Sequence, residues 1–298
     1  MINKIKIAFW GSSKFSVYCL EELKSQAILP SLIITTPDMP TGRGLKLTPT
    51  PVKVWAEQNN IECLTPNKLG AEFITKLVTY NLDLSLVASY GKIIPKNVID
   101  FPKYNTLNIH PSLLPKYRGP SPLQEQILND EKNIGITIMQ IDEQVDHGPI
   151  VSQKKLGIID WPVKFDGFEK ITAEEGVKLF IEILPDWILG KIKPAEQIHS
   201  EATFTKKVEK NDGLLDLEFD DPYKNYLKFL AYSTWPQVFF FIEKKNNLTS
   251  TLPLANGREK MRVIIKDAEY ANGQFIILKV LPEGKKEMPY EDFLRGLK

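Results

Sequence analysis

The sequence predicts an α/β protein in which a mostly parallel sheet, with helices on both faces, is followed by a small antiparallel β-barrel. Three observations lead to this fold. Short, almost continuously apolar runs alternate with amphipathic stretches up to residue 190, a pattern typical of strands buried on both faces and their connecting helices. After residue 207 short strand-like runs are separated by Asn-Asn, Asn-Gly and Glu-Gly turns. A polar stretch separates the two patterns.

The N-terminal elements alternate as strand and helix. The apolar run 5–10 is a predicted buried strand, and the Gly-Ser-Ser turn at 11–13 caps a helix over 14–25. Pro51 begins the next helix, because the first helical position does not need a backbone N–H. The same alternation predicts strands at 31–36, 61–64 and 82–89, and helices at 51–60 and 70–80.

The pattern continues with strands at 106–110 and 134–142, a helix at 122–130 between them and a long helix at 171–190. Residues 191–206 are polar and predict a linker. The apolar runs 239–245, 261–270 and 275–281 then predict the antiparallel strands. We therefore expect a domain at 1–190, a linker at 191–206 and a β-barrel domain at 207–298.

Bulk composition is that of a folded protein. Of 298 residues, 43% are hydrophobic and 25% are charged, and the formal net charge of +1 neither indicates nor excludes a nucleic-acid partner. The two cysteines form neither a disulfide framework nor a metal-ligand spacing. The apolar run at the N-terminus is too short for a signal peptide, and no stretch has membrane-spanning length. We expect a soluble, cytoplasmic protein without a bound metal.

Two polar residues lie at the end of the predicted strand 106–110. Asn108 and His110 are two positions apart, so their side chains share one face of the strand. Ligands bind at the carboxyl ends of strands in open α/β sheets. Taken alone, this pattern is more often a turn-capping asparagine and a satisfied core histidine than a functional pair. The following loop adds Lys116 and Arg118, and the strand at 134–142 ends near Asp142, Glu143, Asp146 and His147.

Other chemistries lack their motifs. The first turn has no G-x-G-x-x-G spacing, no G-x-S-x-G elbow activates Ser112, and no phosphate-binding loop is present. His110, His147 and Asp146 have no known metal-ligand spacing. An asparagine N–H can stabilise an oxyanion, and a histidine assisted by an aspartate can move protons. This set favours acyl or formyl transfer to an amine.

Two longer runs carry a resemblance to a known family. Asn-Ile-His-Pro-Ser-Leu-Leu-Pro-Lys-Tyr-Arg-Gly, from residue 108, and Gly-Ile-Thr-Ile-Met-Gln-Ile-Asp-Glu-Gln-Val-Asp-His-Gly, from residue 135, resemble the folate-dependent formyltransferases over nearly the whole chain. The resemblance implies a Rossmann-like catalytic domain and an OB-like C-terminal barrel. It implies catalytic roles for Asn108, His110 and Asp146. It further implies a site for 10-formyltetrahydrofolate, the formyl donor, at Ser112, Leu113, Leu114, Pro115, Tyr90 and Gly91.

Within that family, methionyl-tRNA formyltransferases are the most similar. Glycinamide-ribonucleotide formyltransferases are shorter single domains, whereas sugar-nucleotide formyltransferases have a comparable length. The loop 36–47, the helix start at 49–56 and the barrel runs 234–238 and 281–288 resemble landmarks of the tRNA enzymes. The resemblance implies that Arg43 and Lys46 contact tRNA and that the C-terminal domain binds it. Residues 206–298 hold sixteen basic and fourteen acidic residues, a small basic excess for that role.

The expected activity is formyl transfer to the free amine of methionyl-initiator tRNA in translation initiation, by a monomer with no membrane association. Asn108 would donate a hydrogen bond to the oxyanion, and Asp146 would orient His110. His147 stands where the family usually has a small residue. Two alternatives remain at this stage: an amino-sugar-nucleotide N-formyltransferase, and a non-catalytic tRNA- or nucleotide-binding protein on the same scaffold.

Overall fold

The computed structural model describes residues 5–41, 44–243 and 260–297. The chain forms two compact units. The first is made of the segments Met1–Leu123, Lys132–Ile158 and Gly167–Lys206. The second contains Lys207–Lys298 and two short segments from the middle of the chain, Gln124–Glu131 and Ile159–Asp166.

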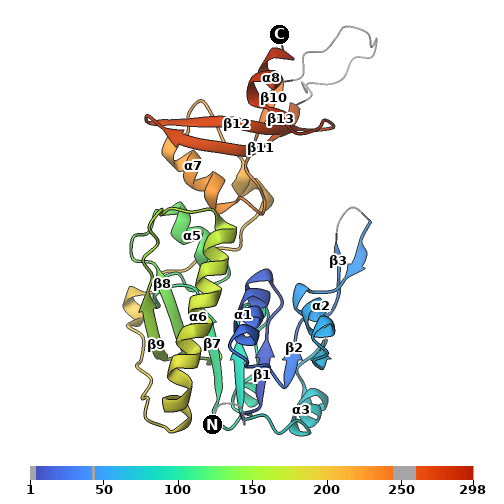
Figure 1. Ribbon diagram of the computed structural model, residues 1–298, viewed down its shortest axis with the longest axis vertical. Helices are drawn as coiled ribbons and strands as arrows, with labels where there is room; N and C mark the ends of the chain where they lie inside the picture. The colour runs from blue at the N-terminus through green and yellow to red at the C-terminus, as the bar shows by residue number, and fades with distance from the viewer. Residues whose placement is uncertain (1–4, 42–43, 244–259, 298) are drawn as a thin grey trace. The chain divides into compact units, whose positions relative to one another are not determined.

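A seven-stranded sheet forms the centre of the first unit, with strand order β5-β2-β1-β6-β7-β8-β9 (Figure 1). The strands from β5 to β7 are parallel, whereas β8 is antiparallel to both β7 and β9. The predicted mostly parallel sheet is therefore confirmed. The bounds are Ile7–Trp10 (β1), Leu32–Ile34 (β2), Cys63–Leu64 (β5), Leu84–Val87 (β6), Thr106–His110 (β7), Gly135–Gln140 (β8) and Ile150–Lys155 (β9).

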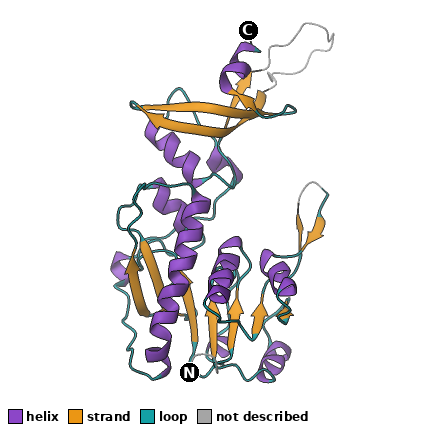
Figure 2. Ribbon diagram, viewed as in Figure 1, coloured by secondary structure: helices purple, strands orange, loops and turns teal. Residues whose placement is uncertain are grey.

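Helices cover both faces of this sheet (Figure 2). On one face, Phe73 of α3 and Val98 of α4 join an apolar cluster with Trp10 and Ile34 of the strands. On the other, α1 and α6 meet where Cys19 Sγ lies 3.9 Å from the Ala173 carbonyl oxygen. The helices are Lys14–Ser25 (α1), Pro51–Gln58 (α2), Ala71–Val78 (α3), Lys96–Ile99 (α4), Pro122–Leu128 (α5) and Phe165–Ile188 (α6).

Helix α6 approaches β7 closely at Gly176. A Cβ atom added there would lie 2.5 Å from Cγ2 of Ile109 and 3.5 Å from Cγ2 of Ile136. Ile109 lies between Asn108 and His110 in β7. A glycine in the middle of the helix therefore lets the helix pack directly beneath the two polar residues of the strand.

The variant Gly176→Ala should lower the free energy of unfolding by about 1–3 kcal/mol, because the added methyl overpacks the core against Ile109. Gly167 of the same helix is a matched control, since a Cβ there meets nothing within 4 Å. Gly167→Ala should be neutral or stabilise by up to about 1 kcal/mol. Thermal unfolding of both variants tests this; equal melting temperatures would show that α6 and β7 adjust without cost.

The second unit contains a four-stranded antiparallel sheet with strand order β10-β11-β12-β13. The predicted antiparallel C-terminal sheet is confirmed, and its closure into a barrel stays a prediction. Helix α7 packs on this sheet, where the rings of Tyr223 and Tyr270 lie 5.0 Å apart. The bounds are Pro222–Ala231 (α7), Phe239–Glu243 (β10), Lys260–Ala271 (β11), Gln274–Pro282 (β12), Met288–Pro289 (β13) and Tyr290–Arg295 (α8).

Across the described ranges, every helix is too short or too polar to cross a membrane.

Candidate active site

Asn108 and His110 lie on one face of β7, as their spacing predicts. In the β7–β8 pairing, Asn108 is opposite Met139 and His110 is opposite Thr137. Both side chains are buried, with relative exposures of 9% and 3%. Strand β7 is central because β6 and β8 pair with it on either side. The two side chains are therefore held by a rigid element rather than a loop.

His110 faces Asp146, which lies in the loop between β8 and β9. His110 Nδ1 lies 3.6 Å from Asp146 Oδ1. His110 Nε2 donates a hydrogen bond to the Tyr117 carbonyl oxygen at 3.0 Å, and because a carbonyl only accepts, this nitrogen carries the proton. The backbone N–H of Gly119 donates to Asp146 Oδ2 at 2.7 Å. Nδ1 and Oδ1 are thus the two atoms left to exchange protons with a substrate.

The Asn108 side chain makes no hydrogen bond within the described part of the chain, although it is buried. Its amide atoms are not among the fully enclosed polar atoms without a partner, so the amide at the 9% exposed residue retains some access to solvent. Its strand neighbours on the same face are paired: Thr106 Oγ1 donates to the Ile99 carbonyl oxygen at 2.7 Å. The arrangement leaves the Asn108 N–H groups available for a ligand.

The Ser-Leu-Leu-Pro turn is built around Thr137 of β8. The Thr137 hydroxyl donates to the Ser112 carbonyl oxygen at 2.7 Å and accepts from the Leu114 N–H at 3.1 Å. Gln153 donates to the same hydroxyl at 2.9 Å. Ser112 is fully buried and its own hydroxyl donates to the Lys116 carbonyl oxygen. Ser112 and Leu114 are buried and shape the turn, whereas Leu113 and Pro115 are partly exposed.

Tyr90 and Gly91 follow β6, the strand next to β7. The Tyr90 ring packs edge-on to Trp10 at 5.2 Å, and its hydroxyl is buried with no hydrogen-bond partner among the described residues. Burial raises the pKa of Tyr90 to about 12. Gly91 has φ +80°, a conformation that suits glycine. The Tyr90 side chain belongs to the apolar cluster that includes Trp10 and Phe73, and its phenol stays neutral near pH 7.

Residues after α6 tie the two site loops together, and the sequence did not indicate this. Arg118 is 3% exposed and donates to Gln197 Oε1 from Nε at 3.1 Å and from Nη2 at 2.6 Å. Nη2 also donates to His199 Nδ1 at 2.9 Å. Burial lowers the pKa of Arg118, while Asp146 and Asp142 act in the opposite direction. Because residues 191–206 are polar in composition, their sequence does not indicate that Gln197 is buried.

His147 takes part in a second pair beside the site. Its Nδ1 donates to Asp142 Oδ2 at 2.6 Å, and its ring stacks on His199 with centroids 4.1 Å apart and planes within 3°. The three histidines of the chain therefore gather around the loops that carry Asp146 and Arg118. The bulky residue at 147 is accommodated by the ring of His199.

Comparison with known proteins assigns the chain to a family. Residues 4–184 match the Formyl transferase family. A methionyl-tRNA formyltransferase from Sulfurihydrogenibium sp. (strain YO3AOP1) is 32% identical over 310 residues, covering 99% of this chain and 97% of the relative. The chain belongs to the methionyl-tRNA formyltransferase family.

Solved structures agree with this fold. Methionyl-tRNA formyltransferase from Clostridium thermocellum has a TM-score of 0.58 at 18% identity and covers 93% of this chain and 98% of its own. A sugar N-formyltransferase from Shewanella sp FDAARGOS_354 also has a TM-score of 0.58, at 16% identity, with 86% and 98% covered. At such identities the likeness shows the fold alone. The full-length sequence relatives, not the fold, distinguish the methionyl-tRNA family from the sugar enzymes.

The loop 36–47 of this formyltransferase forms a two-stranded hairpin of Met39–Thr41 (β3) and Lys46–Thr48 (β4). Lys46 is exposed on it, and Leu45 and Leu47 are 74% and 65% exposed. At its base Lys53 Nζ lies 2.9 Å from Asp38 Oδ1. Arg43, predicted to contact tRNA with Lys46, lies outside the described residues. The hairpin thus presents apolar and basic groups to solvent.

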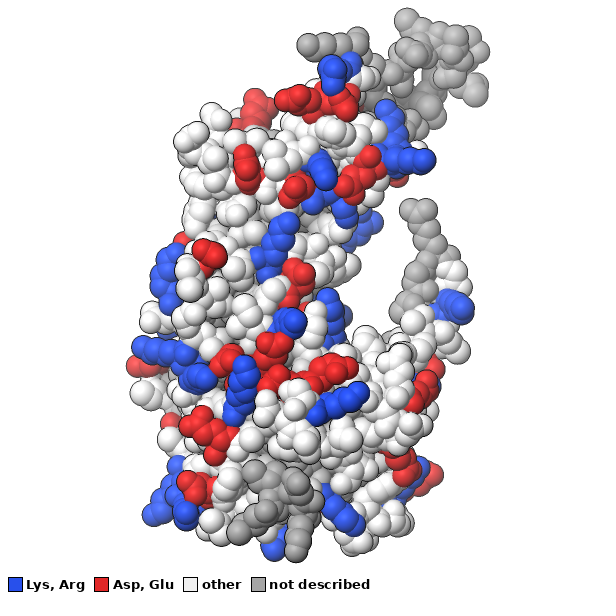
Figure 3. Space-filling view, in the orientation of Figure 1, with Lys and Arg blue, Asp and Glu red and all other residues white. Residues whose placement is uncertain are grey.

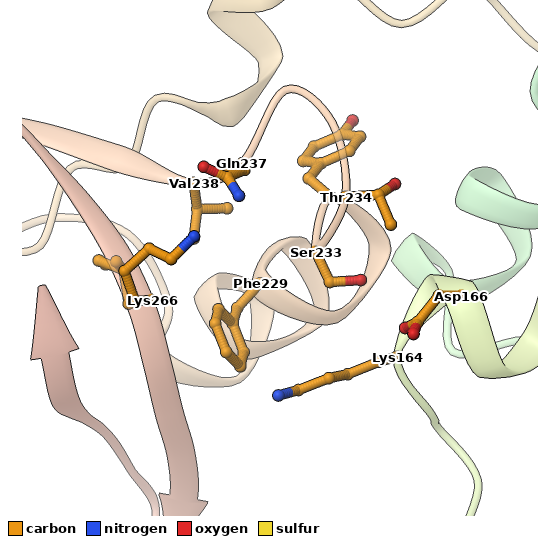
Figure 4. Close-up of a pocket in the computed structure, with 10 residues that line it drawn as sticks. Lys164, Asp166, Phe229, Ser233, Thr234, Gln237, Val238 and Lys266 are labelled. Atoms are coloured by element: carbon orange, nitrogen blue, oxygen red, sulfur yellow. The ribbon is translucent and has the colours of Figure 1, made fainter. Parts of the chain in front are cut away.

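A small pocket of about 220 Å³ lies within the second unit of the formyltransferase (Figure 4). Lys164, Lys266 and Phe229 are among its lining residues, and Lys164 Nζ lies 5.2 Å above the Phe229 ring. Ser233 lines the pocket too, and its hydroxyl is buried with no hydrogen-bond partner in the described ranges. Asp166 also lines the pocket, and Lys164 Nζ lies 3.8 Å from Asp267 Oδ1, so carboxylates partly balance its basic groups.

Acidic and basic side chains are interspersed on the surface of each unit drawn in Figure 3, without a large area of one sign. This agrees with the small basic excess of the C-terminal residues. The face drawn in Figure 3 therefore carries no uniformly basic area.

Proposed function

We propose that this formyltransferase, a cytoplasmic monomer, transfers the formyl group of 10-formyltetrahydrofolate to the α-amino group of methionyl-initiator tRNA. We propose Asn108, His110 and Asp146 as the residues at the reacting atoms. The observation that carries the proposal is the 3.6 Å approach of His110 Nδ1 to Asp146 Oδ1, with the other nitrogen and the other oxygen engaged elsewhere.

The amine proton has a defined destination in this arrangement. The attacking amine must lose a proton as the new C–N bond forms, and a base within hydrogen-bond reach accelerates that step. Because His110 Nε2 is occupied by the Tyr117 carbonyl, only Nδ1 of the ring can accept, and it faces Asp146. The carboxylate stabilises the imidazolium that forms. We therefore assign proton acceptance to His110 Nδ1 and charge stabilisation to Asp146. As the tetrahedral intermediate collapses, the bond between the formyl carbon and N10 of the folate breaks, and the proton held by His110 passes to N10.

Asn108 would act on the formyl oxygen. Attack by the amine places negative charge on that oxygen, and a preorganised N–H donor stabilises it without reorganisation. The side chain of Asn108 is buried on the same strand face as His110 and has no partner within the described residues. One donor of this kind contributes about 3–4 kcal/mol to transition-state stabilisation.

The residues beside the site fit a folate. A pterin ring offers donors and acceptors along its edge and an apolar face, and Tyr90 supplies an unpaired buried hydroxyl at the end of the neighbouring strand. Leu113 and Pro115 supply partly exposed apolar surface in the Ser-Leu-Leu-Pro turn. We propose that Gly91 gives backbone access and that Ser112 and Leu114 hold the turn in shape.

The acceptor is the part of the proposal that the sequence relatives support most directly. Lys46 and the exposed leucines of the hairpin are suited to a nucleic-acid backbone and its sugars. Lys164 and Lys266 of the second unit offer further phosphate contacts. We propose 207–298 as a tRNA-binding domain after a catalytic domain at 1–190.

A direct comparison of acceptors tests the function. The full chain would be incubated with 10-formyltetrahydrofolate and either methionyl-initiator tRNA or an amino-sugar nucleotide, and the formylated product measured. We expect only the tRNA to be formylated, with a rate that falls as salt rises. Formylation of the sugar nucleotide would replace the proposed acceptor, and tRNA binding with no product would indicate a non-catalytic protein.

The variant Lys46→Ala should raise KM for methionyl-tRNA and reduce the log–log salt slope of its binding by about 1, because one phosphate contact is lost. Affinity for the folate should not change, since the hairpin carries none of the proposed folate residues. Lys191→Ala is a matched control, because Lys191, just after α6, is a surface lysine paired with Asp186 of that helix rather than a residue of the hairpin. A salt slope equal to that of the parent would remove Lys46 from the tRNA interface.

A further inference from the structure

Gln197 is a buried amide in a segment whose composition resembles a linker. It is 4% exposed, although Ile198 next to it is 60% exposed. Its Oε1 accepts both hydrogen bonds from Arg118. Its Nε2 donates to the carbonyl oxygens of Asp146, at 3.0 Å, and Gly148, at 2.7 Å. The partners at each end determine which way the amide points, because one end requires an acceptor and the other requires a donor.

The two ends of Gln197 hold the two loops of the catalytic pair. Arg118 follows Tyr117, whose carbonyl oxygen orients the His110 ring. At the other end, Asp146 has φ +49°, in the left-handed region that costs a residue other than glycine about 1–3 kcal/mol unless its surroundings hold it. The Gly148 backbone passes so close to the Gln140 carbonyl that an added Cβ would collide with it. The hydrogen bonds from Gln197 Nε2 to the Asp146 and Gly148 carbonyl oxygens therefore join the side chain to this constrained turn.

We propose that Gln197 is a positioning residue for the reaction. It bridges Arg118 to the Asp146 turn and so keeps Asp146 Oδ1 facing His110 Nδ1. This inference rests on the proposed function. The Gln197 side chain contacts neither reacting atom; it acts through the backbone of Asp146 and the guanidinium of Arg118. Because a displacement of about 1 Å in a catalytic group can cost about 100-fold in rate, a small rotation of the turn is enough to lower turnover.

Two substitutions in the full chain separate the ends of the bridge. Gln197→Met keeps the length of the side chain but removes all four hydrogen bonds. Gln197→Glu keeps acceptors for Arg118 but removes both N–H donors to the Asp146 turn. Trp187→Phe is the control, because it also removes a side-chain N–H bond to a distant carbonyl, that of Tyr104 at 2.9 Å, away from the site.

We expect both Gln197 variants to lower kcat for methionyl-tRNA formylation by about 10- to 100-fold, with KM for 10-formyltetrahydrofolate within about twofold of the parent. Trp187→Phe should lower the melting temperature about as much as the Gln197 variants do, but keep the parental kcat. Reduced kcat in Gln197→Glu assigns the effect to the Asp146 turn. Should Gln197→Met fail to fold, Gln197→Glu carries the test.

A double-mutant cycle with Asp146→Asn completes the test. If Gln197 acts through Asp146, adding Gln197→Glu to Asp146→Asn should lower kcat by no more than about twofold further, because coupled residues are not additive. Multiplicative losses, or single variants that keep parental kcat, would overturn the positioning role. An inactive parent chain would instead contradict the proposed function, so the two failures are distinguishable.

Discussion

Replacing Asp146 with asparagine should lower kcat by about 10²- to 10⁴-fold, the range that general acid–base catalysis supplies. Asparagine keeps the shape and can still accept the Gly119 N–H bond through its oxygen. It has no negative charge to stabilise the imidazolium that forms on His110. Single-turnover formylation of methionyl-tRNA measures the chemical step directly, and equilibrium binding of the folate should be unchanged.

Asp142→Asn is the matched control for this variant. Asp142 lies on the same loop, but its carboxylate pairs with His147 rather than with His110. It should keep most of the parental kcat. Equal losses in the two variants would mean that the loop, and not the Asp146 charge, determines the rate.

Replacing Asn108 with alanine should lower kcat by about 10²- to 10³-fold, because an oxyanion donor is lost. The effect falls on the transition state, where the charge develops, so the affinity for 10-formyltetrahydrofolate should survive. Asn108→Asp should be equally inactive, since it keeps the shape but lacks the N–H donors. Steady-state kcat with a parallel folate-binding titration measures both quantities.

Thr106→Val is the control for Asn108, because it removes a buried polar group two residues earlier on the same strand face. The Thr106→Val variant should have a lower free energy of unfolding and the parental kcat. An Asn108→Ala variant that fails only through weaker folate binding would reassign Asn108 to donor recognition.

Local patterns in the sequence were sufficient to predict the elements that carry the site. Helix α1 spans the predicted residues 14–25, because the Ser13 cap and the helical periodicity are both local. Strand β7 also matches its predicted range, so the two-residue periodicity correctly put Asn108 and His110 on one face. Their meeting with Asp146 does not follow from strand ends, because β8 is antiparallel to β7 and its end at Gln140 lies opposite Leu107. The loop between β8 and β9 carries Asp146 back to His110.

Long-range contacts could not be predicted in this way. An apolar run has no direction, so nothing in residues 134–142 indicated that β8 is antiparallel to β7. Gln197 meets the Asp146 carbonyl 51 residues along the chain, within a segment whose polarity predicted a linker. Thr137, at the centre of the Ser-Leu-Leu-Pro turn, resembles any other residue of an apolar strand. Such contacts depend on tertiary packing rather than on local preference.

The second unit is assembled from three stretches of chain, and this restricts how such a protein can be divided or recombined. Tyr223 donates to Asp130 at 2.9 Å, and Lys164 lies over Phe229, so both short segments from the middle of the chain contact the C-terminal portion. A single cut after Lys206 would leave those segments behind without their partners. The first unit is therefore interrupted twice along the chain, and shuffling the C-terminal stretch between relatives requires exchanging all three stretches of the second unit together.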